Sequence, residues 1–591
     1  MTIKAIPQTK NRIAEISETE MINPLIFGGL ILGALLLFAV YYRLMFPGLT
    51  NADALDFAQI GRNLAEGRGF TTYIVRPLAL VADSSPQHIP DTTHGPLYPL
   101  LLALAFGASG AKDSVVAIVS GLFYVLTVPL VYLLGHRIFN PRVAIIAAGI
   151  FAVNALDLEY AASGLHITLF TFLMACLFLS LYELAQTAYR EKNRSEGVPR
   201  ATLLLTGALC GLLYLTDPIF LWISPLVLLA VLWLCPDFRG TALFLFLAPL
   251  LGLMLPWMLR NQIVAGNALF GTRASEIWMN TSAYPGSSAY RMLPDEFIPG
   301  GGILNAVMRK LISGSNQIIQ VFPQLSIGWL LLFFVPSLLY PFKRESVSAV
   351  RAVTLLCLGG VAFGTLLFTV QMPLFVSLVP SMLVFSVGYF LQMVEGSELT
   401  PAAKRLLNAF FLFLLLCPLV TDLFFTEHTP PLRSTIAAKG LHEVIPQNVA
   451  ILSDQPWITA WYTDRPSIWL PNSDNRVSDI RKRFPEVRWL FLTEQSRSYS
   501  STWQYVYDVL YRWTLVAAET KRTGGTPPRP FVISGKEQPL LNALEGFTSI
   551  SPDQPFPTVV IAGWRSPAPT PDAGNHAPRP AMIPPSAGEA P

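Results

Sequence analysis

Two carboxylates one helical turn apart, Asp53 and Asp56, follow directly on a long apolar run in the stretch "LTNADALDFAQIGRNLAEG". Neighbouring acids raise each other's pKa and both resist removal from water, so this position is energetically unfavourable. One interpretation is functional: a general base beside a second acid that binds a cation or orients an acceptor. The other is structural: Asp53 complements the dipole of a helix that begins after Thr50 or Asn51, and Asp56 is solvated. The residues alone leave both interpretations open.

The composition indicates that these acids are positioned by membrane helices. Of 591 residues, 52% are hydrophobic and 13% are charged, whereas soluble domains carry about 25% charged residues. Because the apolar residues fall in long blocks, we predict a polytopic α-helical membrane protein. The net charge of +3 is small and dispersed, which argues against a nucleic-acid partner. The five cysteines lie in apolar runs without a CxxC pair, so neither a disulfide framework nor a thiolate metal site is predicted.

A window of about 20 apolar residues predicts about eleven transmembrane helices between residues 25 and 425. They fall at 25–43, 114–134, 143–157, 165–185, 201–216, 218–235, 241–259, 322–342, 350–370, 372–394 and 405–425. The run 96–107 is too short to cross and is predicted to lie along the membrane surface. Lys and Arg gather in alternate connections, which the positive-inside rule assigns to the cytoplasm. We therefore predict a multi-pass protein of the cytoplasmic membrane with a cytoplasmic N-terminal segment, residues 1–24.

Three parts of the chain are predicted to be extracytoplasmic: loop 44–113, loop 260–321 and everything after the last span. In this last part "NVAILS", "PSIWLP", "VRWLFLT" and "PTVVIAGW" are typical of short strands, with helical patterns between them. We predict a small C-terminal α/β domain over residues 428–566, on the same side as loop 44–113. Residues 567–591 are proline-rich with little to bury, which indicates a disordered tail.

Several stretches resemble the C-type membrane glycosyltransferases, in particular the protein O-mannosyltransferase and aminoarabinose transferase group. "DALDFAQIGRNLAEGRGF" followed by "HGPLYPLLLALAFG" is similar to the first extracytoplasmic loop of that family. "GALCGLLYLTDPIFLWISPL", "PWMLRNQIVAGNALFGT" and "VIPQNVAILSDQPWITAWYTDRPSIWLP" resemble a helix pair, a loop and the periplasmic domain of its members. The resemblance covers residues 25 to about 560. It implies transfer of a sugar from a polyprenyl-phosphate-linked donor, at the membrane lipid surface, to an extracytoplasmic acceptor.

The resemblance also implies roles for individual residues. Asp53 matches the family's catalytic Asp, with Asp56 as the second acid. Such a base would deprotonate an acceptor hydroxyl while a lipid phosphate leaves the anomeric carbon, and that anion needs cations. The candidate substrate-binding residues are Arg62, Arg68, Arg76, Arg260 and Asn261. Asp91 and His94 stand where relatives can carry a metal ligand, so a divalent metal ion is the one cofactor that the resemblance implies.

Departures from the family pattern keep an alternative open. Ala54 and Ile167 stand where an acid is common, Asp217 replaces the Arg of an "LTRP" motif, and "MPLFVSLVP" lacks an expected Arg. The alternative is a catalytically degenerate relative that serves as an accessory subunit among other membrane proteins. A transporter is disfavoured because the chain shows no paired Gly/Pro-broken spans in matching halves. Asp53 in an open polar cavity near a cation would favour the enzyme, and a collapsed cavity would favour the subunit.

Overall fold

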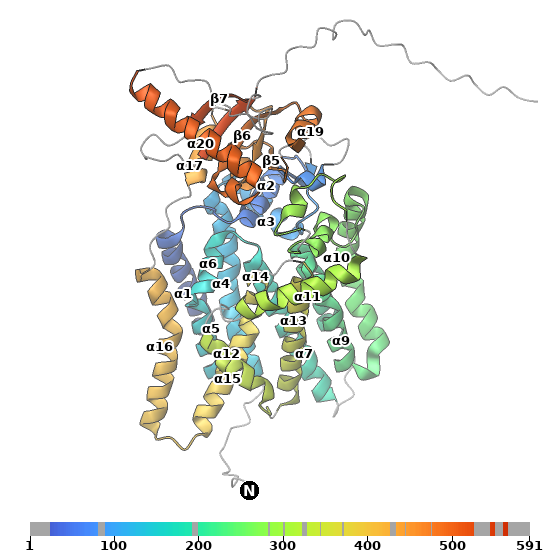
Figure 1. Cartoon of the computed structure of the whole chain (residues 1–591). Coiled ribbons are helices and arrows are strands. Elements are labelled where there is room, and N and C mark those ends of the chain that lie inside the picture. Colours follow the sequence, from blue (N-terminus) through green and yellow to red (C-terminus); the bar gives the residue numbers. More distant parts are fainter. Residues whose placement is uncertain are drawn as a thin grey trace, which may run out of the picture.

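The computed structural model describes residues 24–80, 89–191, 199–281, 284–298, 302–321, 328–342, 344–368, 372–425, 433–443, 445–473, 475–524, 544–549 and 559–564. A bundle of long helices carries a mixed β-sheet at one end, together with the loops that precede the sheet in sequence (Figure 1). The predicted cytoplasmic segment up to residue 23 and the predicted tail 567–591 lie outside the described residues.

Six described helices are long and apolar enough to cross a membrane. They are α1 (Pro24–Met45), α4 (Asp113–Ile138), α7 (Ile167–Glu191), α10 (Arg239–Ala265), α13 (Glu345–Leu367) and α16 (Pro401–Phe425). A seventh candidate is the pair α5 (Pro141–Ala152) and α6 (Ala155–Ser163), which is bent by 54°. The helical membrane architecture is thus confirmed, whereas the count of eleven spans is not.

The remaining predicted spans also fall on helices, but these are short or interrupted. They are α8 (Arg200–Thr216), α9 (Ser224–Leu234), α12 (Gly328–Leu339) and α15 (Val379–Gly396), the last preceded by α14 (Met372–Val376). Asp217 ends α8, because its side chain caps the 3-10 turn Pro218–Trp222 that follows. The segment predicted to lie along the membrane surface forms α3 (Leu97–Ser109), whose 13 residues span about 20 Å, less than the ~30 Å core of a bilayer.

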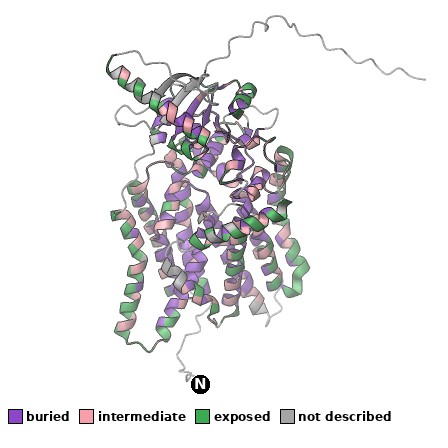
Figure 2. Cartoon of the chain, viewed as in Figure 1, coloured by how far each residue is buried: buried purple, intermediate pink, exposed green. Residues whose placement is uncertain are grey.

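Burial distinguishes inner from outer helices (Figure 2). Side chains of α4 and α7 are buried within the bundle, whereas α1 and α16 expose large apolar side chains such as Leu32, Leu406 and Phe413. Exposed apolar faces on helices of this length fit contact with lipid chains. The amphipathic helix α11 (Gly302–Val321) crosses obliquely in front of α13 (Figure 1).

The larger sheet has six strands in the order β2-β5-β4-β6-β8-β7. Their bounds are β2 (Ile74–Val75), β4 (Ala450–Ser453), β5 (Ser467–Trp469), β6 (Val487–Thr493), β7 (Leu544–Ser549) and β8 (Val559–Trp564). The first four in sheet order are parallel, and β8 and β7 are antiparallel. The four predicted strand segments contain β4, β5, β6 and β8. Because β2 comes from loop 44–113 and pairs with β5, the first loop and the C-terminal part meet in one sheet.

The other elements surround this sheet. A two-stranded ladder joins β1 (Thr71–Thr72) to β3 (Ile89–Pro90). The helices of the C-terminal part are α17 (Arg433–Leu441), α18 (Pro456–Thr463), α19 (Asn475–Arg483) and α20 (Ser501–Arg522).

Helix α2 (Ala52–Ala65) presents the two acids of the first loop. Its N-cap is Asn51, whose Oδ1 accepts from the backbone N–H of Asp53 at 2.9 Å, as the capping signal predicts. The helix ends before Gly67, which has a left-handed φ of +77° that favours glycine. Gly61 allows close packing on α3, because a Cβ there would lie 2.8 Å from Leu102 Cβ.

Candidate active site

A cavity opens between the first loop, the ends of α7 and α8, and loop 260–321, and its space, part of it open to solvent, amounts to about 490 Å³. Its acidic lining residues are Asp53, Asp217 and Glu276, and its basic ones are Arg76, His94, His166 and Arg273. Three of these seven, Asp53, Arg76 and His94, were predicted site residues. Charged groups of both signs therefore meet in one space at the end of the bundle that carries the sheet.

The first charge cluster in the wall is built around Arg76. Its Nη2 donates to Asp56 Oδ2 at 2.5 Å, and its Nη1 lies 3.9 Å from Asp91 Oδ1. The ring of His94 lies between the same acids, with Nδ1 3.3 Å from Asp91 and Nε2 3.7 Å from Asp56. Burial alone would lower the pKa of His94, but the two carboxylates raise it above its ordinary value. The pKa of Asp91 is held low despite burial, because His94 and Arg76 stabilise the charged form.

The second cluster is centred on Arg273, which comes from the 3-10 helix Gly271–Trp278 of loop 260–321. Its Nη1 donates to Asp217 Oδ1 at 2.9 Å, and its Nε donates to Glu276 Oε1 at 3.2 Å. His166 Nε2 lies 3.2 Å from Asp217 Oδ2 on the other side. Although burial raises the pKa of Asp217, Arg273 and His166 outweigh it and hold that pKa low. The cation missing from the "LTDP" motif is thus supplied by a residue far along the chain.

The structure separates the two acids that open the first loop. Asp53 is exposed and lines the cavity, and its carboxylate forms no ion pair among the described residues. Asp56 is only 3% exposed. Its oxygens accept from Arg76 and, at 3.3 Å, from Thr72 Oγ1. Asp53 is therefore the acid that a ligand in the cavity can reach, and Asp56 holds Arg76 in place.

Arg62 and Arg68, which are not among the cavity lining, connect α2 and the turn after it to the C-terminal end of α18. Arg62 donates to the carbonyl oxygens of Ala460 and Trp461 at 3.0 and 2.9 Å, and it pairs with Asp464 at 3.2 Å. Arg68 lies 3.5 Å from the same carboxylate. The structure thus gives these two predicted substrate-binding residues a role in joining the sheet to the first loop.

Arg260 and Asn261 lie behind the first cluster instead of in the cavity lining. Arg260 Nη1 donates to the backbone oxygen of Asp91 at 2.5 Å and to Asn261 Oδ1 at 3.0 Å. Its guanidinium stacks 4.7 Å above the ring centre of Trp257. These contacts support the turn that carries Asp91 and His94.

Asp56, Asp91 and His94 could hold a metal ion, since one ligand atom from each lies within 4.8 Å of the others. Arg76, however, already bonds to Asp56 and lies beside Asp91. The ring of His94 also lies between the same carboxylates, which raise its pKa and so favour its charged form. A divalent ion would have to displace the guanidinium of Arg76, so the arrangement as it stands fits the two basic side chains better than a metal.

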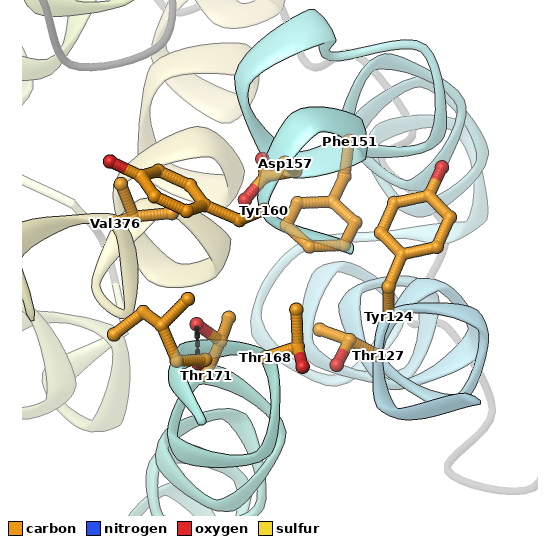
Figure 3. Close-up of a pocket in the computed structure, with 9 residues that line it drawn as sticks. Tyr124, Thr127, Phe151, Asp157, Tyr160, Thr168, Thr171 and Val376 are labelled. Carbon is orange, nitrogen blue, oxygen red and sulfur yellow. Dashed lines mark hydrogen bonds between the residues drawn. The ribbon is translucent and has the colours of Figure 1, made fainter. Parts of the chain in front are cut away.

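A second, smaller cavity of about 220 Å³ lies among α4, α6 and α7 (Figure 3). Asp157 borders it on one side, and Thr168 and Thr171 border it on the other. Thr171 Oγ1 donates to the backbone oxygen of Ile167 at 2.8 Å, within its own helix. None of the described residues that line this cavity is Lys, Arg or His. A leaving phosphate would find no cation there, which makes the larger cavity the candidate active site.

Comparison with known proteins bears on the family and the fold. Residues 93–259 match the family described as dolichyl-phosphate-mannose-protein mannosyltransferase. No curated protein sequence matches the chain. The oligosaccharyltransferase of Archaeoglobus fulgidus, solved with Zn and sulfate, is 13% identical with a TM-score of 0.55, over 90% of this chain and 72% of that one.

Two further solved structures carry lipid phosphates. The same archaeal protein, AglB, in complex with an inhibitory peptide and a dolichol-phosphate, is 12% identical with a TM-score of 0.55, over 92% of this chain and 74% of that one. ArnT from Cupriavidus metallidurans bound to undecaprenyl phosphate is 11% identical with a TM-score of 0.52, over 91% of this chain and 97% of that one. The resemblance to C-type glycosyltransferases is confirmed, and at these identities the structural matches establish the fold alone.

Sequence reasoning missed Arg273, Glu276 and Tyr290. Tyr290 OH donates to Glu276 Oε1 at 2.8 Å and closes the second cluster. One signal was available: Asp217 stands between apolar helices, and an acid in such a place needs a partner. The sequence could not show which of the many arginines supplies it.

Proposed function

We propose that this chain is a membrane glycosyltransferase that moves a sugar from a polyprenyl-phosphate-linked donor to a hydroxyl group of an extracytoplasmic acceptor. The observation that carries the proposal is the exposed Asp53 in a polar cavity whose walls hold Arg76 and Arg273. Dolichol-phosphate and undecaprenyl phosphate in the two solved relatives support a lipid phosphate as the carrier. A collapsed cavity would favour an accessory subunit, and the cavity beside Asp53 is open, so that alternative is not favoured.

In the proposed reaction Asp53 is the general base. Its carboxylate accepts the proton of the acceptor hydroxyl as that oxygen attacks the anomeric carbon of the donor sugar. The bond between the anomeric carbon and the phosphate oxygen breaks, and the lipid phosphate leaves with the electron pair. Arg76 and Arg273 stabilise the negative charge that develops on the phosphate.

The remaining acids of the cavity wall are proposed as positioning residues. Asp56 and Asp91 fix Arg76 from one side, and Asp217 and Glu276 fix Arg273 from the other. A guanidinium that is already held does not need to reorganise when the charge develops, which is the condition for strong electrostatic stabilisation. Because Arg76 and His94 already lie between the carboxylates of the first cluster, no step of the proposed reaction passes through a metal.

The proposal places the cavity on the outer side of the cytoplasmic membrane. Residues 25–425 would form the membrane domain, and 428–566 would form an α/β domain that β2 completes. Two observations support this: the sheet and the first loop share one side, and the Lys- and Arg-bearing connections follow the positive-inside pattern of the opposite side.

The test uses the full chain in proteoliposomes with undecaprenyl phosphate carrying a tritiated hexose, from a panel of hexoses. We expect Asp53→Asn to reduce sugar release by about 10²- to 10⁴-fold without changing the thermal midpoint, because the amide keeps the shape and loses the base. Asp237→Asn, which changes an exposed acid outside the cavity, is the matched control. The proposal would be contradicted if Asp53→Asn released as much sugar as the wild type. It would also be contradicted if the folded wild type released no sugar from any donor.

A further inference from the structure

The C-terminal sheet contains a switch point in its strand order. β4 lies between β5 and β6, and all three strands are parallel. From β4 the chain passes through α18 to β5 on one side, and then through α19 to β6 on the other. In open sheets of this kind, ligands bind outside the carboxyl ends of the strands where the direction of winding reverses. Here that place lies between Asp454 and Gln455, which follow β4, and Glu494 and Gln495, which follow β6.

The side chains at this switch point leave hydrogen-bond acceptors unused. Asp454 is fully buried, and its Oδ2 accepts from the N–H and the hydroxyl of Thr493 at 2.8 and 2.7 Å. Gln455 donates from Nε2 to Thr493 Oγ1 and to Gln495 Oε1, both at 3.0 Å. The other oxygens, Asp454 Oδ1 and Gln455 Oε1, are buried and have no partner among the described residues, so a ligand that bonds to them must first displace the atoms that cover them. Since both are acceptors, the ligand that fits them carries donors such as hydroxyl groups.

Three half-buried aromatic rings form a series of contacts that begins at Asp454. Trp457 meets Trp469 edge to face, with ring centres 5.5 Å apart, and Trp469 Nε1 donates to Tyr499 OH at 3.2 Å. Tyr499 OH in turn donates to the backbone oxygen of Asp454 at 2.8 Å. Arg291 stacks 3.6 Å from the centre of the Tyr499 ring and fixes it. Aromatic faces beside unused acceptors suit a ligand that has both apolar faces and hydroxyl groups, which is the chemistry of a sugar.

The same sheet edge leads to the candidate active site. β2 runs parallel to β5, so the carboxyl end of β2 lies at the same edge, and Arg76 is the first residue after it. Strands lie about 4.8 Å apart, which puts Arg76 about 10 to 14 Å from the switch point between β4 and β6. Trp469 bridges this interval, because it also packs against the cluster that contains Tyr290, a residue of the cavity lining.

We propose that this carboxyl edge of the sheet binds the acceptor, and that the acceptor is an oligosaccharide. Its hydroxyl groups donate to Asp454 and Gln455, and its apolar faces contact Trp457 and Trp469. Its far end reaches the cavity, where a hydroxyl meets Asp53. The distance along the edge requires an extended chain of sugars, since a single sugar cannot contact both places. This inference rests on the proposed transferase function and names its acceptor class.

The test measures binding of unlabelled trisaccharides to the detergent-solubilised full chain by saturation-transfer NMR. The probes are mannotriose, maltotriose, cellotriose and chitotriose at about 10 mM, a concentration that detects millimolar affinity. We expect at least one of them to bind, and to bind more tightly than its monosaccharide. Gln455→Ala and Trp457→Ala should each weaken that binding about tenfold or more. Gln504→Ala, at an exposed glutamine on α20, is the matched control.

Asp53→Asn separates this inference from the function on which it rests. This variant should bind the trisaccharide as the wild type does while losing sugar transfer. Failure of transfer with trisaccharide binding intact would count against the proposed function and not against the acceptor site. Three results would overturn the acceptor site: no trisaccharide binds, binding survives both Gln455→Ala and Trp457→Ala in folded protein, or a serine-rich peptide binds and no sugar does.

Discussion

Arg273 is the residue on which the second wall of the cavity depends, because two buried acids share its guanidinium. Arg273→Met would leave Asp217 and Glu276 without that partner, and breaking a buried pair costs about 3 to 5 kcal/mol. We expect a lower thermal midpoint and loss of undecaprenyl phosphate binding. Arg273→Lys keeps the positive charge but cannot reproduce the forked hydrogen bonds of a guanidinium. We expect this variant to keep most of the wild-type stability and to lose most of the phosphate binding.

The measurement for Arg273 is retention of undecaprenyl phosphate by the purified protein, with the thermal midpoint recorded in parallel. Arg488→Met, at an exposed arginine on β6, is the control for loss of positive charge. If Arg273→Lys and Arg273→Met both retained as much lipid phosphate as the wild type, Arg273 would not belong to the proposed phosphate site.

His94 should make stability depend on pH. Burial lowers its pKa, but Asp56 and Asp91 raise it more, so the folded protein holds the proton more tightly than the unfolded chain. The stability from this proton is complete below the ordinary histidine pKa of about 6.5 and is lost as pH rises through the folded value. The lowered pKa of Asp91 acts in another window: its contribution is present above a pKa of about 3.9 and is lost on acidification.

We therefore expect the thermal midpoint of the wild type to fall as the pH is raised from mildly acidic to alkaline values. His94→Gln should flatten that slope, because no proton remains to be lost at this site. His442→Gln changes a histidine outside the cavity and should leave the slope unchanged. A slope that is equally steep in His94→Gln would assign the pH dependence to other groups.

Asp53 was predictable at the residue scale because its signals are local. The Asn51 cap and the end of the apolar run lie within a few residues of it. Arg273 was not predictable, since its partner Asp217 is 56 residues away. Arg62 looked like a phosphate ligand in sequence, yet the fold brings it to carbonyl groups of α18. The role of a charged side chain therefore depends on which element, distant in the sequence, packs against it in the fold.

At the scale of elements, the turn that carries His94 packs against the end of α8 through Gly95. A Cβ on Gly95 would overlap the backbone oxygens of Leu215 and Thr216. Gly95→Ala must therefore separate the first loop from α8, at an overpacking cost of about 1 to 3 kcal/mol. We expect lower sugar transfer and a lower thermal midpoint. Gly107→Ala on α3, where no atom lies within 4 Å of the added carbon, should leave sugar transfer unchanged and should not lower the thermal midpoint, since alanine is the better helix former.

Long elements with one strong pattern were predictable, and short or interrupted ones were not. The apolar runs fell on helices, but the pattern could not show that α5 and α6 bend by 54°. β4 and β6 have alternating or apolar runs, whereas β2 has only two residues and becomes a strand because β5 is beside it. Such a strand is formed by tertiary pairing, which no local propensity records.

At the scale of the whole molecule, the sheet and the helices are joined at several separate points. Asp113, at the start of α4, accepts from Trp461 Nε1 at 2.7 Å and from Tyr462 OH at 2.8 Å. Arg62 of α2 bonds to the same helix, α18, and β2 joins the sheet itself. Because α18 directly follows β4, these contacts turn the carboxyl edge of the parallel strands toward the helices and the cavity.

Because the sheet, the first loop and the helices are joined, the membrane side on which the sheet lies also fixes the side on which Asp53 lies. We expect Ser498→Cys, on the exposed surface near the sheet, to react with a membrane-impermeant maleimide in intact cells. Glu398→Cys, exposed between α15 and α16, should react only after lysis, as the positive-inside pattern requires. The wild type is the background control: among its five cysteines only Cys417 is exposed, and it lies on the apolar helix α16. The reverse labelling pattern would put Asp53 on the cytoplasmic side, away from extracytoplasmic acceptors, and would contradict the proposed function.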